Sequence, residues 1–339
     1  MKITFVGAGR WAMTLALILH QKKNTIAMWE YAPERIEHIN RTRKMPELPD
    51  SIEVPSDLIV TDELEQVFDN IDMIFFAVPS QVLRNVLITI SPFRFANITN
   101  GKLPLIVSAM KGLENNTNKR MTQILKEFYP HLKIVVLSGP GIPYEIAAGK
   151  PASLVVASND TNAAKLVQDA LSTDLLRVYL QSDVIGTEFG GALKNVIAIA
   201  AGICDGLQLG DNAKAALITR GLIEMSRIGI AFNANPMTFA GLSGIGDLMV
   251  TAYSQYSRNR LFGEKVGQGL SSDEALALFN GVVEGFATTM TAKKLGAKMR
   301  LELPIIEEIA DILYNHTDLT KSVKKLMQRP LKKEMIHEA

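Results

Sequence analysis

The chain has 339 residues, a formal net charge of +1 and 47% hydrophobic residues. This length fits roughly two domains, and the apolar content is ample for their cores. Because the charge is almost balanced, it excludes the basic excess that attracts nucleic acid or acidic membranes.

Residue types that form disulfides or bind metals are sparse. Cys204 is the single cysteine, which excludes an intrachain disulfide framework and favours a reducing compartment. The histidines are scattered along the chain, which argues against a zinc site; they are His20, His38, His131, His316 and His337. We therefore expect a cytoplasmic protein without a bound metal.

We expect neither a signal peptide nor a membrane span. The first residues, MKITFV, run directly into a glycine loop and leave no room for a signal peptide. The apolar run from Val196 to Cys204 is far shorter than the roughly 18 residues that cross a bilayer.

The first predicted strand, Lys2 to Val6, is followed at once by the loop GAGRWA and then by a helix-periodic run over residues 13–19. In this context the loop predicts a dinucleotide site. Gly7 allows the tight turn, Gly9 lets the backbone approach the pyrophosphate, and Ala12 takes the last small position. The helix N-terminus then offers N–H groups to the phosphates. The alternative is a tight turn without a ligand.

A second predicted strand, Thr25 to Trp29, ends at an acid. Glu30 lies about twenty residues beyond the glycine loop, where a carboxylate accepts hydrogen bonds from the adenosine ribose. The same charge repels a 2′-phosphate, so it favours NAD over NADP. The alternative is a solvated turn acid, with the neighbouring Tyr31 as the contacting residue.

Strands and helices alternate through the first half of the chain, which predicts a doubly wound, largely parallel sheet. The further predicted strands are Met73 to Val78, Leu105 to Ser108, Ile134 to Leu137, Ser153 to Ala157 and Arg177 to Leu180. Predicted helices run from Ser80 to Ile90 and from Asn118 to Phe128.

Loops after three of these strands carry residues that suit a binding crevice. Pro79 follows the third strand, Lys111 the fourth and Gly139 the fifth, with Pro143 just beyond. We expect Pro79 and Pro143 to contact the cofactor. In such sheets ligands bind beyond the carboxyl ends of the strands, so these loops are expected to border one crevice. Lys111 there is either an anion or carbonyl ligand or a surface lysine.

Helical patterns replace strand patterns after about residue 187. A helix is predicted from Ala215 to Ile230, Ser272 has the features of an N-cap, and Pro304 suits the first turn of another helix. We expect an α/β fold with a Rossmann-like doubly wound sheet at residues 1–187 and an all-α substrate and catalytic domain at 188–330. Residues 331–339 form a polar tail.

One lysine lies within an apolar helix of this second half. The segment GGALKNVIAIAAGICDG places Lys194 among small and apolar residues, and a helix that is apolar nearly all round is buried. Burial lowers the pKa of a lysine toward neutrality, which suits a proton donor to a carbonyl. The alternative is a lysine that reaches water or pairs with a carboxylate.

Two further motifs contain charged residues. Asp247 lies in the glycine-bounded turn GIGDL, where it is either a site acid or an N-cap. The segment SRNR brings together Ser257, Arg258 and Asn259, and the arginine fork suits a phosphate. The alternative is that this tetrapeptide is an ordinary surface segment without a ligand.

Taken in order, the motifs GxGxW, VPS, KGLE, SGP, GALKNVIAIAAGxxDG, RGxxEM, GxGDL, SRNRxFG and VVEG resemble the NAD(P)-dependent glycerol-3-phosphate dehydrogenases of the bacterial biosynthetic type. The resemblance covers nearly the whole chain. It implies reversible reduction of dihydroxyacetone phosphate to sn-glycerol 3-phosphate for glycerophospholipid synthesis, a Rossmann-like first domain, an all-α second domain and a homodimer.

The resemblance also implies roles for matching residues. Lys194 matches the catalytic lysine, and Lys111 the lysine that contacts substrate and cofactor. Substrate-site positions match Gly139, Asp247, Ser257, Arg258 and Asn259. Cofactor-contact positions match Arg10, Trp11, Arg258, Val282 and Glu284. We count Asp247 with the two lysines in the catalytic group.

This chain departs from the family pattern at three positions. Arg10 stands where a small polar residue is usual, Ala12 where glycine is common, and Gly141 where many members have threonine. None of these changes removes a charged catalytic group, but Arg10 bears on the choice between NAD and NADP.

Three competing interpretations remain. A lysine-dependent 3-hydroxyacid or ketopantoate-type reductase shares this plan, but SRNR beside GDL favours a phosphorylated triose. Lactate- or malate-type enzymes depend on a catalytic histidine, and no histidine lies in a site motif here. A non-catalytic nucleotide-binding protein is disfavoured by the intact Lys194, Lys111, Asp247 and Arg258.

Overall fold

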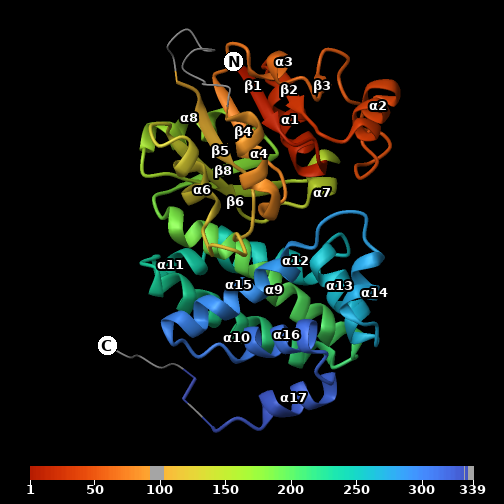
Figure 1. Cartoon of the computed structure of the whole chain (residues 1–339), viewed down its shortest axis with the longest axis vertical. Coiled ribbons are helices and arrows are strands. Elements are labelled where there is room, and N and C mark those ends of the chain that lie inside the picture. The colour runs from red at the N-terminus through yellow and green to blue at the C-terminus, as the bar shows by residue number, and fades with distance from the viewer. Residues whose placement is uncertain (92–102, 332, 335–339) are drawn as a thin grey trace.

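The structure, a computed structural model, describes residues 1–91, 103–331 and 333–334. It has two halves stacked along the long axis, a sheet flanked by helices and a wholly helical half (Figure 1). The N-terminus lies in the sheet half, and the last helix, α17 (Leu319–Met327), lies at the opposite end of the molecule.

Over the described residues the sheet has eight strands in the order β3-β2-β1-β4-β5-β6-β7-β8. All neighbouring strands are parallel except β6 and β7, which confirms the predicted doubly wound, largely parallel sheet. The strands are β1 (Lys2–Val6), β2 (Thr25–Trp29), β3 (Ile59–Thr61), β4 (Met73–Phe76), β5 (Leu105–Ser108), β6 (Ile134–Ser138), β7 (Ala152–Ala157) and β8 (Leu176–Gln181).

Helices cover both faces of this sheet, so most of its strands are apolar along their whole length. Phe5 and the next residue of β1, Val6, are both fully buried but belong to different core clusters, one on each face. The helices and helical turns are α1 (Arg10–Gln21), α2 (Pro33–Thr42), α3 (Leu64–Phe68), η1 (Ser80–Val82), α4 (Leu83–Ile90), α6 (Met121–Phe128), α7 (Pro143–Ala147) and α8 (Thr161–Leu171).

The strand order reverses direction at β1 and β4, and a ligand crevice is expected at such a point. The loops that follow β1, β4, β5 and β6 all leave the sheet at this carboxyl edge. The helical half lies below that edge (Figure 1), so residues of both halves are available to a ligand bound there.

The helical half is built around α9 (Val184–Gly206), whose residues from Gly186 to Cys204 are all buried. Its other elements are α10 (Gly210–Ala231), α11 (Pro236–Phe239), η2 (Leu242–Gly246), α12 (Asp247–Tyr253), α13 (Arg258–Gly267), α14 (Ser272–Ala277), α15 (Glu284–Met299), α16 (Pro304–Asn315) and α17. Among the described residues α9 alone is long and apolar enough to cross a membrane, and 89% of its most apolar window is buried inside the protein. It is the central core helix of this half.

Several predicted boundaries differ from the structure. The short edge strand β3 was not predicted, because three residues are too few to show alternation. The predicted helix at Ser80 begins as the separate turn η1, and the one predicted from Asn118 begins at Met121 because Asn118 has a φ of 58°. The N-cap predicted at Ser272 is Ser271, whose side chain accepts a hydrogen bond from Glu274 N.

Other boundaries agree more closely. The strand predicted to end at Val78 ends at Phe76, and the helix predicted from Ala215 to Ile230 is the longer α10. The helix predicted at Pro304 begins there. Of the predicted polar tail, residues 332 and 335–339 lie outside the described residues.

Candidate active site

Two lysines from different halves of the molecule share one buried carboxylate. Lys194 Nζ on α9 donates a hydrogen bond to Asp247 Oδ1 at 2.7 Å, and Lys111 Nζ donates to Asp247 Oδ2 at 2.5 Å. Asp247 is 1% exposed and Lys194 6% exposed. The structure therefore brings together the three residues predicted as the catalytic group.

Lys194 lies in the middle of α9, whereas Lys111 and Asp247 are positioned by the ends of secondary-structure elements. Lys111 follows β5, and its Nζ also donates to the Gly139 carbonyl oxygen at 2.9 Å, in the loop after β6. Asp247 is the first residue of α12, and its carboxylate contacts the lysines instead of capping the helix. The turn before it needs glycine, because a Cβ on Gly244 would lie 2.1 Å from the Phe239 carbonyl oxygen.

Burial sets the protonation behaviour of Lys194. Burial lowers its pKa to about 8, with Asp247 raising it and the charge of Lys111 lowering it. Both sequence interpretations of Lys194 are thus met, since this lysine is buried and is also paired with a carboxylate. An amine with this pKa can give or take a proton near neutral pH.

A chain of amide contacts links the lysine cluster to the SRNR segment. Asn195 Nδ2 donates to the Lys111 carbonyl oxygen at 3.3 Å, and Asn259 Nδ2 donates to Asn195 Oδ1 at 2.9 Å. Asn259 Oδ1 in turn accepts from Gly285 N at 2.9 Å. Ser257 is the N-cap of α13, so its hydroxyl accepts from Arg260 N.

Arg258, the first residue of α13, lies against a glycine. A Cβ built on Gly281, which has a φ of +118°, would come within 2.5 Å of Arg258 Nη1. Glu284 is close enough to raise the pKa of this guanidinium, whereas burial lowers it. Glu284 itself accepts hydrogen bonds from Ser80 N at 2.9 Å and from the Ser80 hydroxyl, which ties α15 to the loop after β4.

The glycine loop has the form of a dinucleotide cradle. Gly7 has a φ of +99°, and a Cβ there would lie 3.0 Å from Val78 Cγ1. A Cβ built on Gly9 would meet no other described atom within 4 Å, so the backbone is open to a close ligand. Gly9 is also the N-cap of α1, where no side chain of the described part of the chain caps the first N–H groups. These residues fit a pyrophosphate.

The residues beside this loop include the predicted Arg10, Trp11 and Ala12. Arg10 is the first residue of α1. Burial, together with the neighbouring charge of Arg258, lowers the pKa of its guanidinium to about 10. Arg10 on the sheet half therefore lies near Arg258 on the helical half. Trp11 lies over Gly141, where a Cβ would come within 3.1 Å of Trp11 Cη2.

Glu30 is not the solvated turn acid considered as an alternative, since it is 6% exposed. Its carboxylate accepts hydrogen bonds from Ala8 N at 3.1 Å, Tyr31 N at 3.0 Å and Ala32 N at 3.2 Å. It thus fixes the glycine loop against the end of β2, and its bond to the ribose stays a prediction.

The remaining predicted cofactor contacts lie outside the lysine cluster. Pro79 precedes η1, and Pro143 begins α7, where its carbonyl oxygen accepts from Thr14 Oγ1 at 3.3 Å. The side chains of Tyr31 and Val282 are exposed, the residues being 73% and 39% accessible.

The sequence interpretation missed residues that contact the cluster directly. Thr251 Oγ1 accepts from Lys194 Nζ at 2.6 Å and donates to the Asp247 carbonyl oxygen at 2.6 Å. Its spacing of four residues from Asp247 on one helix is a signal that could have found it. Asn195 and Ser80, both inside quoted motifs, were also not singled out.

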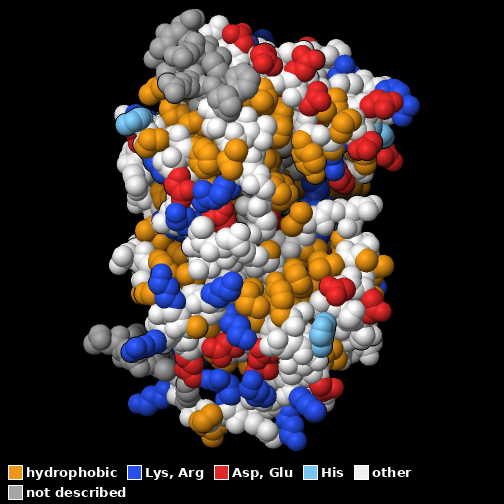
Figure 2. Space-filling model, viewed as in Figure 1, with side chains coloured by type: hydrophobic (Ala, Val, Ile, Leu, Met, Phe, Trp, Pro, Cys, Tyr) orange, Lys and Arg blue, Asp and Glu red, His pale blue; other side chains and the backbone are white. Residues whose placement is uncertain are grey.

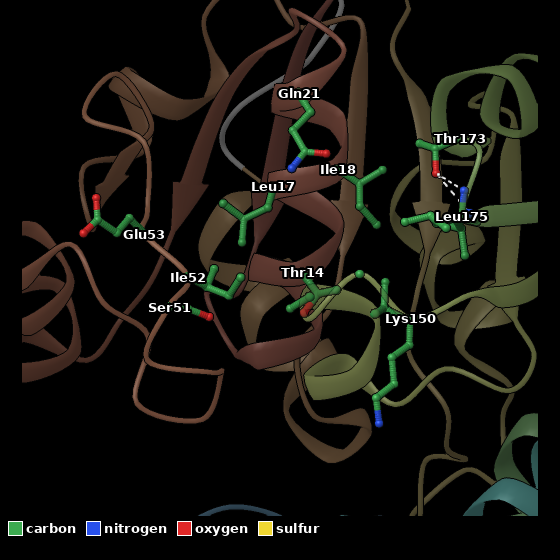
Figure 3. A pocket seen from close by; sticks show the side chains of 14 residues that line it. Thr14, Leu17, Ile18, Gln21, Ser51, Ile52, Glu53, Lys150, Thr173 and Leu175 are labelled. Atoms are coloured by element: carbon green, nitrogen blue, oxygen red, sulfur yellow. Dashed lines mark hydrogen bonds between the residues drawn. The ribbon is translucent and has the colours of Figure 1, made fainter.

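A separate cavity of about 370 Å³ lies away from these residues. It is bordered by α1, the loop at residues 51–53, α7 and residues 173–176, and Figure 3 shows Leu17, Ile18, Ile52 and Leu175 around it. None of the predicted site residues lines it.

Acidic and basic side chains are interspersed over the face in Figure 2, in keeping with the balanced charge.

Comparison with known proteins matches both halves to one family. Residues 2–164 match the family model described as "NAD-dependent glycerol-3-phosphate dehydrogenase N-terminus". Residues 183–324 match the model described as the "C-terminus" of the same family. The chain is 42% identical over 338 residues to a glycerol-3-phosphate dehydrogenase [NAD(P)+] of Syntrophotalea carbinolica, covering 99% of this chain and 100% of that one.

Solved structures agree with this match. A crystal structure of glycerol-3-phosphate dehydrogenase from Coxiella burnetii has a TM-score of 0.91 and 32% identity, covering 96% of this chain and 98% of that one. A ketopantoate reductase from Ralstonia eutropha has a TM-score of 0.59 and 13% identity, covering 97% and 100%. The second likeness is one of fold alone.

Proposed function

The chain belongs to the NAD-dependent glycerol-3-phosphate dehydrogenase family, and from this premise we propose that it reversibly reduces dihydroxyacetone phosphate to sn-glycerol 3-phosphate with NAD(P)H. The observation that carries the proposal is the buried cluster of Lys194, Asp247 and Lys111, to which both halves contribute. The bound nicotinamide supplies the hydride that is added to C2 of the ketone.

Lys194 is the proposed general acid. As C2 is reduced, the carbonyl oxygen gains negative charge, and the Lys194 ammonium donates its proton to that oxygen to give the alcohol. In the reverse direction the neutral amine takes the proton back. A pKa of about 8 leaves the lysine mainly protonated at neutral pH and still able to exchange its proton.

Neighbouring residues hold the proton donor and the substrate. Asp247 and Thr251 fix the direction of Lys194 Nζ, and the second ammonium, on Lys111, adds positive charge where the oxyanion develops. Arg258 and Asn259 are the proposed phosphate ligands, because a guanidinium fork and an amide suit phosphate oxygens. Binding energy from that remote group would orient C2.

The cofactor is NAD or NADP, and we propose a preference for NAD. The support is Glu30, whose buried carboxylate lies at the end of β2 beside the glycine loop. A cytoplasmic location and a homodimer are also proposed, the first from the single reduced cysteine and the second from the family resemblance. Light scattering of the purified protein tests the dimer.

The decisive experiment is a spectrophotometric assay of NADH and NADPH oxidation with dihydroxyacetone phosphate. Lys194→Ala is expected to lower kcat by about 100-fold or more while NADH binding is retained, since loss of a positioned acid costs about that much. Lys214→Ala is the matched control, because Lys214 is equally buried at 6% exposure but pairs with Asp205. Full turnover by the Lys194 variant would remove this lysine from the catalytic role.

A further inference from the structure

An ion cluster extends from Glu30 away from the glycine loop. Arg35 on α2 places Nε 4.0 Å from Glu30 Oε2 and Nη1 3.5 Å from Glu47 Oε2. Its side chain is 35% exposed, so the guanidinium is accessible to solvent. Arg35 is therefore shared between two carboxylates, one on the residue that follows β2 and one from the loop between α2 and β3.

The two carboxylates are held by different means. Glu30 is fixed by three backbone N–H donors, one of them Ala8 of the glycine loop. The backbone on either side of Glu47 is anchored, since Met45 and Leu48 are each 4% exposed and pack into the core of the sheet half, while the Glu47 side chain is 36% exposed. Neither acid needs to move for Arg35 to be paired.

The charge of Glu47 acts on arginines of both halves. It raises the pKa of Arg10 on α1 and of Arg258 on α13, both of which burial lowers. Glu47 thus lies within electrostatic range of both sides of the cofactor cleft. It adds negative charge close to the acid that ends β2.

In dinucleotide folds this position distinguishes the two cofactors. An acid at the end of the second strand binds the ribose hydroxyls of NAD, whereas a nearby arginine accommodates the 2′-phosphate of NADP. Both residue types are present here, as Glu30 and Arg35. Which cofactor is preferred then depends on whether the guanidinium is available to a phosphate.

We propose that Glu47 is a specificity-determining residue, which excludes NADP by holding Arg35 in an ion pair and by repelling the 2′-phosphate. The inference rests on the proposed function and concerns the same cleft. Arg35 is the cation that a 2′-phosphate would use, and Glu47 competes with that phosphate for it.

Binding titrations of NAD⁺ and NADP⁺ by calorimetry test this without turnover. Glu47→Gln is expected to tighten NADP⁺ binding by about 10-fold and to change NAD⁺ binding by less than about 2-fold, because only NADP⁺ carries the repelled group. Glu47→Ala is expected to give the same gain. Glu53→Gln is the matched control, since Glu53 lies in the same loop, is 78% exposed and pairs with Lys44.

The double variant Glu47→Gln, Arg35→Gln separates the two parts of the proposal. Without Arg35 the gain for NADP⁺ is expected to fall below about 3-fold, since only the repulsion has been relieved. Equal changes for both nucleotides, a full gain without Arg35, or equal affinity of the unmodified protein for both would overturn the proposal. Failure of the proposed function would instead appear as no oxidation of NADH with dihydroxyacetone phosphate.

Discussion

At the scale of single residues, the site is organised by one carboxylate that has two cationic partners. Each oxygen of Asp247 accepts from a different lysine, and the aspartate is 1% exposed. Two ammonium groups held this close without an acid would repel each other in a poorly solvated place. Asp247 therefore both positions Lys194, the proposed proton donor, and favours its protonated form.

This role predicts a change of pH profile in Asp247→Asn. In the proposed mechanism Lys194 must be protonated to reduce the ketone, so kcat/KM for reduction is expected to fall as the pH rises through about 8, the pKa of Lys194. Asp247 is the group that raises that pKa, so the variant is expected to lose activity at a pH lower by about one unit or more. Oxidation of glycerol 3-phosphate, which needs the neutral amine, would shift in the same direction.

The measurement is kcat/KM for both reactions between about pH 6 and 10. Asp205→Asn is a control, because Asp205 pairs with the buried Lys214 and with Arg260 outside the cluster. If kcat/KM falls at the same pH in Asp247→Asn as in the unmodified protein, and only the rate is reduced, then another group sets the pH profile.

At the scale of elements, two helices that carry site residues pack unusually closely. Glycines four residues apart on α9 and on α13 face each other, so that backbone meets backbone. A Cβ built on Gly202 would lie 1.9 Å from the Arg260 carbonyl oxygen, and a Cβ built on Gly263 would lie 2.0 Å from the Ile199 carbonyl oxygen. Gly206 and Gly267 make similar contacts. This approach brings Arg258 and Asn259 beside the helix that holds Lys194.

Gly202→Ala is therefore expected to be destabilising and to weaken substrate binding. The added methyl meets a backbone carbonyl group that cannot rotate away, so we expect a loss of about 1–3 kcal/mol in the free energy of unfolding. Because α13 must shift, KM for dihydroxyacetone phosphate is expected to rise several-fold, about 5-fold or more.

Urea unfolding and steady-state kinetics measure the two effects. Gly296→Ala on α15 is the matched control, since its added Cβ meets the end of the Leu303 side chain, which can move. An unchanged KM in a destabilised Gly202 variant would show that the closeness of the helices serves stability alone.

Elements were predictable from the sequence to the extent that their signals are local. The strands of the sheet half have continuous apolar runs, so β1, β2 and β5 were placed at their observed bounds. The contact of α9 with α13 was not predictable, because a glycine on one helix does not reveal which backbone it faces. Glu30 was placed correctly just after β2, but its three backbone donors come from the fold.

At the scale of the whole molecule, the loop after β5 joins the two halves. Leu113, two residues beyond Lys111, is fully buried and belongs to the core of the helical half. Asn115 Oδ1 accepts from Thr291 Oγ1 of α15 at 2.7 Å. Glu188 of α9 accepts from Thr122 N of α6 at 2.8 Å and from Arg120. The sheet half thus contributes side chains to the core beneath it.

This sharing predicts that the two halves unfold together. Leu113 lies in the core of the helical half, although the chain on either side of it belongs to the sheet half. Leu113→Ala leaves a cavity in that core, which is expected to lower the free energy of unfolding by about 2–5 kcal/mol. If the halves form one cooperative unit, differential scanning calorimetry will show a single transition at a lower Tm. Leu166→Ala, at a residue that is 57% exposed, is expected to leave Tm nearly unchanged. Two resolved transitions, with only one shifted by Leu113→Ala, would instead mean that the halves fold independently. In that case the lysine cluster, which draws on both, would lose its geometry at the lower of the two temperatures.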